Sequence, residues 1–481
     1  MNASLLIARD EWRYWRRSKL GKLACAVVGL LIVASLVSTF TRIEVEKHKR
    51  EHFQANATEQ FERQPARHPH RMVHYGHYVF RVPVPLSLID PGVDAHAGTV
   101  MFLEGHRQNS AVFAPRYTEA QVGSFADLSP AFVYQVLVPL LLIVLGFSGI
   151  PREREAKTDY LLFAAAVRPQ AMWFGKSLAL AGAAGVALLP LVVGLGIAAF
   201  AGEHMSMIGY MLFGYALYLL VWVFLVIAVA AWSSLASTSL TALLAVWILT
   251  CVVMPPLVAS SAKTLEPAVG KIATDLAVAR ALRDAGDGHN ANDPAFARLR
   301  AQLLEQYGVD DVENLPINFR GVVAEYAEAK QTQVLNALAD EAMTRELAQS
   351  ELVRALSFLS PTLALKNFSM IVAGTDLRQQ HNFQRDAERV RFGFVQSLNK
   401  VHAQQLTYAD DMQRSNDAGA ERRTRVSNAN WRMLETVSVE AGPPGARMSQ
   451  SLYAATILLL WAGLMALLGW IKMQRDVHGG R

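Results

Sequence analysis

Residues 205–232 read MSMIGYMLFGYALYLLVWVFLVIAVAAW and contain no Asp, Glu, Lys or Arg. A bilayer core about 30 Å thick is crossed by a helix of about 20 mostly apolar residues. A single charged side chain at the centre of such a helix costs about 2.5 to 3.5 kcal/mol on insertion scales. The stretch therefore predicts a transmembrane helix.

Similar charge-free windows occur on both sides of this stretch. The chain has 481 residues, of which 52% are hydrophobic and only 18% charged, a composition richer in apolar residues than soluble proteins. We predict an all-α integral membrane protein with a large helical extracytoplasmic domain and a smaller mixed α/β extracytoplasmic module. Its six transmembrane helices are expected at 23–41, 129–150, 177–202, 205–232, within 233–260 after a short cytoplasmic turn, and 450–472.

Lys and Arg residues gather in three short segments, 1–22, 151–176 and 473–481. Short loops rich in Lys and Arg face the cytoplasm, so both termini are expected there. Residues 42–128 and 261–449 then lie outside, where long domains are largely exempt from the charge rule. The net charge of +5 therefore requires no nucleic-acid partner.

The two outside regions differ in their patterns. Residues 43–62 resemble a charged helix, whereas the segments that begin at His77 and Thr99 are rich in β-forming residues, with Asp90-Pro-Gly as a turn between them. These features predict the mixed module of 42–128. In 261–449, apolar residues recur at helical spacing and predict a helical domain.

The link between the second and third spans begins PREREAKTDYLLFAAAVR at position 151. It resembles the signature of ABC-2 transporter permeases, which has a Glu-Arg-Glu start, a Gly-Thr step, a Leu-rich turn and a closing Gly-Lys. The resemblance implies a short coupling helix that receives motion from an ATPase. An ordinary positively charged loop is the alternative. Lys157 and Ala166 depart from the signature, and the matching residues are Glu153, Arg154, Glu155, Thr158, Leu161, Leu162, Val167, Arg168, Gly175 and Lys176.

Residues 8–19, ARDEWRYWRRSK, combine basic and aromatic side chains, as in a helix that lies among lipid headgroups. The segment resembles the amphipathic elbow helix of the same permeases. The alternative is an ordinary flank of a membrane helix, where such residues are common. The elbow residues are Glu11, Trp12, Arg13, Trp15 and Arg16.

Five further stretches resemble bacterial ABC-2 permeases with a DUF3526 domain: HYGHYVF from 74, LIDPGVD from 88, LEGHRQN from 103, LSP from 359, and AGTD from 373 with His381 and Phe383. The resemblance implies an inner-membrane, multi-pass permease without a catalytic site or cofactor of its own. It also implies a separate ABC ATPase subunit that binds ATP and Mg, and a second permease copy or a related permease. Membrane lipid and a periplasmic protein are further expected partners.

The chain carries no phosphate-binding loop. Gly175-Lys-Ser resembles its end, but position 170 is Gln where that loop has Gly. Cys25 and Cys251 both fall in predicted spans, so no disulfide framework is expected.

Histidines suggest a second class of function. His68 with His70, and His74 with His77, have spacings that could bring imidazoles to one Zn²⁺ or Cu²⁺ ion, although local hydrogen bonds explain such residues equally well. A non-transporting membrane anchor or sensor, with an outside domain for signalling or metal handling, is therefore the alternative to a transport subunit.

Overall fold

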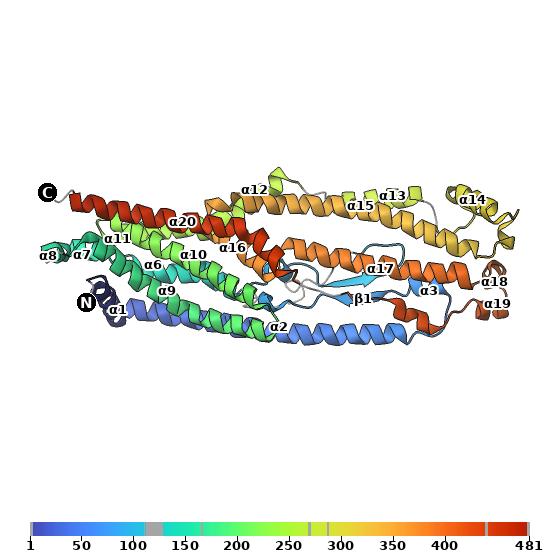
Figure 1. The fold of residues 1–481 in the computed structure, drawn as a ribbon, viewed down its shortest axis with the longest axis horizontal. Helices are drawn as coiled ribbons and strands as arrows, with labels where there is room; N and C mark the ends of the chain where they lie inside the picture. Colours follow the sequence, from blue (N-terminus) through green and yellow to red (C-terminus); the bar gives the residue numbers. More distant parts are fainter. Residues whose placement is uncertain are drawn as a thin grey trace.

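The computed structural model describes residues 3–109, 111, 128–164, 167–267, 271–285, 288–437 and 441–478. The molecule is a long rod (Figure 1). Helices α1, α7 and α8 lie at one end with both chain termini, and α14, α18 and α19 lie at the other. We call the half with the termini the bundle and the other half the arm.

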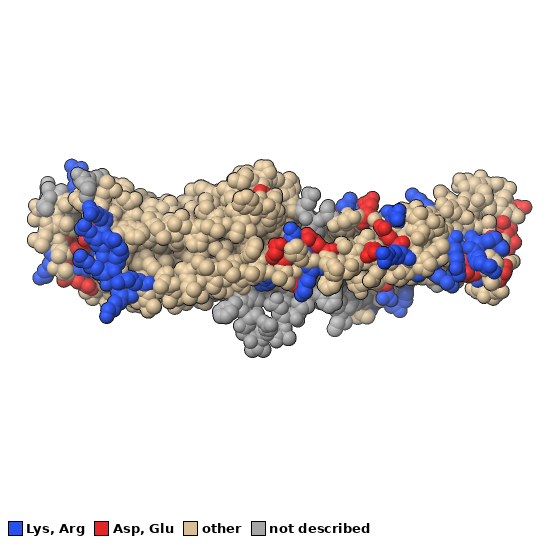
Figure 2. Space-filling view, turned by 90° about the horizontal axis from the view of Figure 1, so that it is seen from below, with Lys and Arg blue, Asp and Glu red and all other residues tan. Residues whose placement is uncertain are grey.

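The bundle contains six helical segments that are long and apolar enough to cross a membrane. Among the described residues the structure thus supports a membrane protein with the predicted number of spans. Figure 2 shows a band of Lys and Arg at the bundle's outer end, a long surface almost without charge, and mixed charges over the arm. The six segments are Lys19–Glu62, Pro130–Glu155, Pro169–Phe200, Met205–Trp232, Ala236–Leu265 and Pro444–Arg475.

Helix α10 (Met205–Trp232) forms the centre of the bundle. Tyr215, Tyr218 and Trp222 on this helix are fully buried. It packs against α9 (Pro169–Phe200) and α20 (Pro444–His478), which are themselves exposed on their outer faces. Apolar side chains on the outside of the bundle are compatible with contact with lipid tails, because hydrocarbon replaces water there.

A short helix, α16 (Pro361–Ala373), enters the bundle from the arm and shares its apolar core. Its polar side chains bond to the bundle: Tyr218 Oη lies 2.9 Å from Thr362 Oγ1, and Ser360 Oγ donates to the Thr250 carbonyl at 2.6 Å. The Thr250 carbonyl lies in a π-helical turn (Ile248–Val253) just before two prolines. Such turns free carbonyls from the helix ladder, so α16 supplies donors where the ladder is interrupted.

The remaining bundle helices are shorter or pass into the arm. Helix α2 continues without a break beyond its apolar part, so the predicted first span and the charged helix after it are one helix of 44 residues. At about 1.5 Å per residue this helix is roughly 66 Å long. The other bounds are α1 Ala3–Arg17, α2 Lys19–Glu62, α5 Pro130–Phe132, α6 Val138–Gly146, α7 Pro151–Glu155, α8 Thr158–Ala164, α11 Ala236–Trp247 and α12 Met254–Leu265.

Two long antiparallel helices, α15 and α17, form the spine of the arm beside the end of α2 (Figure 1). The arm contains α3 Pro69–Val73, β1 His77–Phe80, β2 Val100–Leu103, α13 Lys271–Ala285, α14 Ala297–Tyr307, α15 Phe319–Ala355, α17 Leu377–Gln405, α18 Tyr408–Gln413 and α19 Ala418–Arg423.

The predicted mixed α/β module of 42–128 is wrong. Its described residues contain one two-stranded antiparallel sheet, in which His77 pairs with Leu103 and Phe80 with Val100. A two-stranded sheet is at best marginally stable alone. Here Val79 and Met101 pack against α17, so the strands are part of the helical arm.

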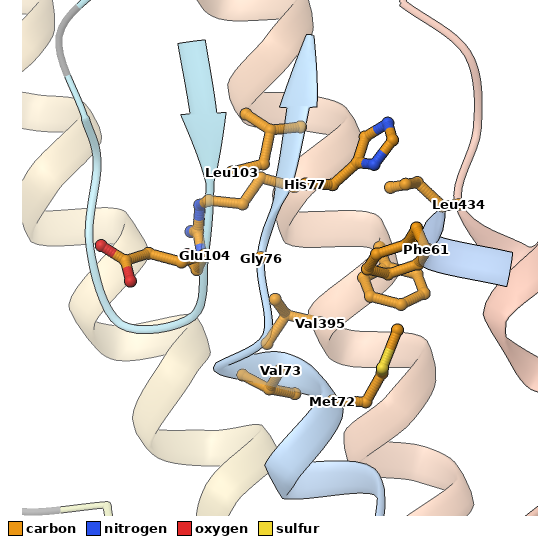
Figure 3. Close-up of a pocket in the computed structure, with 11 residues that line it drawn as sticks. Phe61, Met72, Val73, Gly76, His77, Leu103, Glu104, Val395 and Leu434 are labelled. Atoms are coloured by element: carbon orange, nitrogen blue, oxygen red, sulfur yellow. The ribbon is translucent and has the colours of Figure 1, made fainter. Parts of the chain in front are cut away.

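The two predicted outside regions share one core. Phe61 from α2 and Met72 from α3 pack with Phe394 and Leu398 from α17 and with Trp431. A cavity of about 10 Å³ remains beside Phe61, His77 and Leu434 (Figure 3). This volume suits at most one water molecule. The arm is thus tightly packed around Phe61 and His77.

Candidate functional site

A buried ion cluster lies at the outer end of the bundle, where α1, α7 and α9 meet. The Glu11 carboxylate on α1 contacts Lys176 Nζ on α9 and lies 2.5 Å from Arg152 Nη2 on α7. The side chains of Glu11 and Lys176 are 2% and 4% exposed, so both charges are almost fully removed from water. Charges buried in this way are stable only while they are paired.

Glu153 extends the cluster to the start of α8. Its Oε1 lies 3.0 Å from Lys176 Nζ, and its Oε2 accepts a hydrogen bond from Thr158 Oγ1 at 2.5 Å. The guanidinium of Arg152 also stacks 3.8 Å above the ring centre of Tyr14. These contacts tie the link between the second and third spans to the N-terminal helix and to the third span.

The next two charged residues bind the turn between α10 and α11. Arg154 Nη1 donates to the carbonyls of Ala231 and Ser233 at 2.6 and 2.7 Å. Glu155 Oε1 accepts from the backbone N–H of Ala236 at 2.8 Å, at the start of α11. A cation at a helix C-terminus and an anion at a helix N-terminus both oppose the helix dipole charge. Arg154 and Glu155 thus fix α7 to the turn between α10 and α11.

The backbone is unusual at one further position of the signature, Lys157, and closely packed at another, Gly175. Lys157 has φ of +56°, the left-handed conformation that favours glycine. At Gly175, an added Cβ would lie 2.7 Å from Ile7 Cβ and 2.8 Å from the Ser4 carbonyl. Gly175 therefore permits the close approach of α1 and α9 that brings Glu11 to Lys176.

The tip of α8 projects from the bundle. Tyr160 and Leu161 are 71% and 70% exposed, whereas Leu162 packs partly against the bundle core. Arg168 is exposed at the N-cap of α9. Among the predicted coupling residues, Glu153, Arg154, Thr158 and Leu162 are therefore partly buried, whereas Glu155, Leu161 and Arg168 are exposed. Tyr160, which is exposed beside Leu161, was not among the predicted residues.

The predicted elbow residues divide in the same way. Trp15 is buried, and its Nε1 donates to the Leu145 carbonyl at 2.8 Å. Trp12, Arg13 and Arg16 are exposed, as expected of residues that face headgroups and water. Sequence reasoning placed Glu11 on this surface, but it is the buried centre of the cluster. Glu11 and Trp15 are four positions apart and therefore lie on the same face of the helix. This spacing was the sequence signal that Glu11 could be buried with Trp15.

The structure does not assemble the predicted histidine pairs. His68 lies with His402 and Asp411, 3.2 Å from the Asp411 carboxylate, and burial lowers the pKa of His68 to about 4. His77 lies in the arm core 3.2 Å from Gln54 Nε2, and burial lowers its pKa to about 4. Both imidazoles are neutral at pH 7. His70 and His74 meet each other instead, with two histidines that the sequence analysis did not select.

The Asp411 carboxylate lies between two histidines, His68 and His402. Burial alone would raise its pKa, but hydrogen bonds from His402 and His68 outweigh it and hold the pKa well below the usual range. His402 Nε2 lies 2.8 Å from one carboxylate oxygen, and Asn318 Nδ2 donates to the same oxygen at 3.3 Å. This cluster joins α15, α17 and α18 to the start of α3, which is a structural role.

Taken together, the apolar bundle, its buried ion cluster and the polar arm define a multi-span membrane protein with an ordered link between the second and third spans. Residues 271–437 match a family model described as "Domain of unknown function (DUF3526)". The match covers α13 to α19 and thus most of the arm. The comparison with curated proteins gave no match.

Proposed function

We propose that the chain is the permease subunit of an ABC-2 type transporter in a bacterial inner membrane. In this proposal both termini and α7–α8 face the cytoplasm, and the arm projects outside. A separate ABC ATPase subunit binds ATP and Mg, and its motion passes through α8 into the bundle. A second permease, a copy or a relative, completes the complex, and the product is substrate movement or motion of an envelope partner.

One observation carries the proposal: the residues of the permease resemblance converge in space. Glu153, Thr158 and Lys176 share one ion cluster with Glu11 of the elbow helix. An ordinary charged loop would leave such side chains in water, since surface ion pairs contribute little. Instead the link is fixed to three helices, as a rigid lever requires.

One departure from the signature and two matches to it support the same proposal. The signature has Gly where this chain has Lys157, and Lys157 adopts the conformation that favours Gly. The closing Gly-Lys corresponds to Gly175, which lets α1 approach, and to Lys176, which binds Glu11. Each position thus has a physical reason to carry the residue type of the signature.

The proposed ATPase contact is the outward pair Tyr160 and Leu161, because it is apolar, exposed and held by the fixed α7. Replacing both residues with Asp is expected to lower co-purification of the ATPase encoded beside this chain at least tenfold. Vanadate-sensitive ATPase activity in the purified complex should fall with it. A contact between apolar side chains and a partner groove cannot accommodate two buried carboxylates.

The matched control replaces Tyr307, an exposed aromatic residue at the far end of the arm, with Asp. This variant should bind the ATPase as the wild type does. If the Tyr160 and Leu161 double variant retains normal ATPase binding, or if the wild type binds no ATPase, the proposal is wrong, and a kinase or cyclase partner would favour the sensor alternative.

A further inference from the structure

Four histidines from three separate segments meet on the surface of the arm. His70 and His74 lie one helical turn apart on α3 and its C-cap. His106 follows β2, and His289 lies in the loop between α13 and α14. Each offers one ring nitrogen, and these four atoms all lie within 4.8 Å of one another.

The nitrogen distances suit a metal ion better than hydrogen bonds. His74 Nε2 lies 3.2 Å from His70 Nε2 and 3.4 Å from His289 Nε2. A ring nitrogen carries either one N–H or one lone pair, so it can make only one good hydrogen bond. A tetrahedral Zn²⁺ with Zn–N bonds of about 2.0 to 2.1 Å separates its ligand nitrogens by roughly 3.3 to 3.4 Å. Both observed distances are close to that value.

His106 is already oriented as a metal ligand. Its Nδ1 lies 2.8 Å from Glu328 Oε2, and among the described residues its buried Nε2 has no hydrogen-bond partner. Metal-binding histidines usually bond through their other nitrogen to a carboxylate, which fixes the ring and raises its basicity. Glu328 is itself 1% exposed and lies 2.6 Å from Arg391 Nη1.

The backbone at His106 also points to a site. Its φ of +63° is left-handed and uncommon for a residue other than glycine. Such conformations cost about 1 to 3 kcal/mol and persist where surrounding contacts impose them. Here Glu328 Oε2 accepts from both the backbone N–H and the ring of His106. The same carboxylate thus holds the backbone and the imidazole in place.

We propose that His70, His74, His106 and His289 form a tetrahedral Zn²⁺ site, with Glu328 as the carboxylate that orients His106. Four neutral imidazoles are ligands that Zn²⁺ accepts readily. His74 and His289 are exposed, so an ion can enter from solvent.

The site would link the two halves of the arm. His70, His74 and His106 belong to the segment between the first and second spans, and His289 belongs to the region after the fifth span. Bound Zn²⁺ would therefore hold the loop before α14 against α3. The inference does not depend on the proposed transport function.

The test uses the full chain in detergent micelles, stripped of metal with a chelator and then incubated with excess Zn²⁺. One equivalent of Zn²⁺ is expected to remain after desalting, measured by mass spectrometry of the metal. X-ray absorption should show four nitrogen ligands at about 2.0 Å. Replacing His74 and His289 together with Ala should lower the affinity at least a hundredfold. Because both side chains are exposed, the variant should keep the wild-type circular dichroism.

The matched control replaces His48 and His52, two exposed histidines of α2, with Ala and should bind Zn²⁺ as the wild type does. The single variant His289→Ala gives an independent reading and should lose at least tenfold in affinity. The proposal is overturned if the wild type keeps less than a tenth of an equivalent, or if the His74 and His289 variant binds Zn²⁺ like the His48 and His52 control.

Discussion

Replacing Glu11 with Ala is expected to lower the free energy of unfolding of the bundle by about 3 to 5 kcal/mol, the usual cost of removing one partner of a buried ion pair. The change leaves Lys176 buried with Glu153 alone, and Arg152 loses its carboxylate partner on α1. Helix α1 would then be held against α9 by apolar contacts alone, including those of Ala8 and Trp15. Unfolding of the purified chain in detergent, followed by circular dichroism, measures the loss.

Two variants make this result specific to the ion cluster. Asp10→Ala removes an exposed carboxylate on the same helix and should change stability by less than about 0.5 kcal/mol. Adding Lys176→Met to Glu11→Ala should restore part of the loss, because the second buried charge is also removed. Equal stability of Glu11→Ala and Asp10→Ala would show that the buried pair contributes nothing.

The second large effect is expected in the arm, where Gly321→Ala should destabilise by about 3 kcal/mol. A Cβ at Gly321 would lie 2.3 Å from the backbone nitrogen of Ala403 and 2.7 Å from the carbonyl carbon of His402. Backbone atoms cannot rotate away as a side chain can, so α15 and α17 must move apart. Thermal unfolding of the full chain, followed by near-ultraviolet circular dichroism, reports the change.

Gly393 on α17 provides the matched control. A Cβ there meets no atom within 4 Å among the described residues, and Ala is the better helix former by about 0.5 to 1 kcal/mol. Gly393→Ala should therefore be neutral or slightly stabilising. If Gly321→Ala behaves like Gly393→Ala, the two helices do not approach as closely as the structure has them.

The six apolar helices could be predicted because a charge-free run of about 20 residues is a local property of the sequence. The stretch 205–232 became a helix with the same bounds. The run at 23–41 became only part of α2, because nothing between Thr39 and Glu62 interrupts a helix: this segment contains neither Gly nor Pro. The length of α2 was therefore visible in the sequence, although it was not inferred.

The arm was harder to predict because its contacts join residues far apart in the chain. Trp431 Nε1 donates to the Gln64 carbonyl at 2.9 Å across 367 positions. The β-forming residues around His77 and Thr99 did become strands, but their packing partners lie on α17. The local sequence patterns predicted the two strands. They could not show that the strands pack on helix α17, so the mixed module was a wrong prediction.

The two clusters of functional interest show the same limit. His70 and His74 are spaced one helical turn apart after Pro69, a residue favoured at helix starts, so their meeting could have been predicted. His106 and His289 reach them only through the fold of the arm. Similarly, Glu11 and Lys176 are 165 positions apart, and only the permease resemblance drew attention to both segments.

The orientation of α8 tests the proposed function most directly, because every step assigns residues 151–168 to the cytoplasm. In a background with Cys25→Ala and Cys251→Ala, single cysteines at Tyr160 and Tyr307 are treated with a membrane-impermeant maleimide. We expect Tyr160→Cys to react in inverted membrane vesicles and not in spheroplasts, and Tyr307→Cys to show the reverse. Reaction of Tyr160→Cys in spheroplasts, with protection in inverted vesicles, would contradict the account.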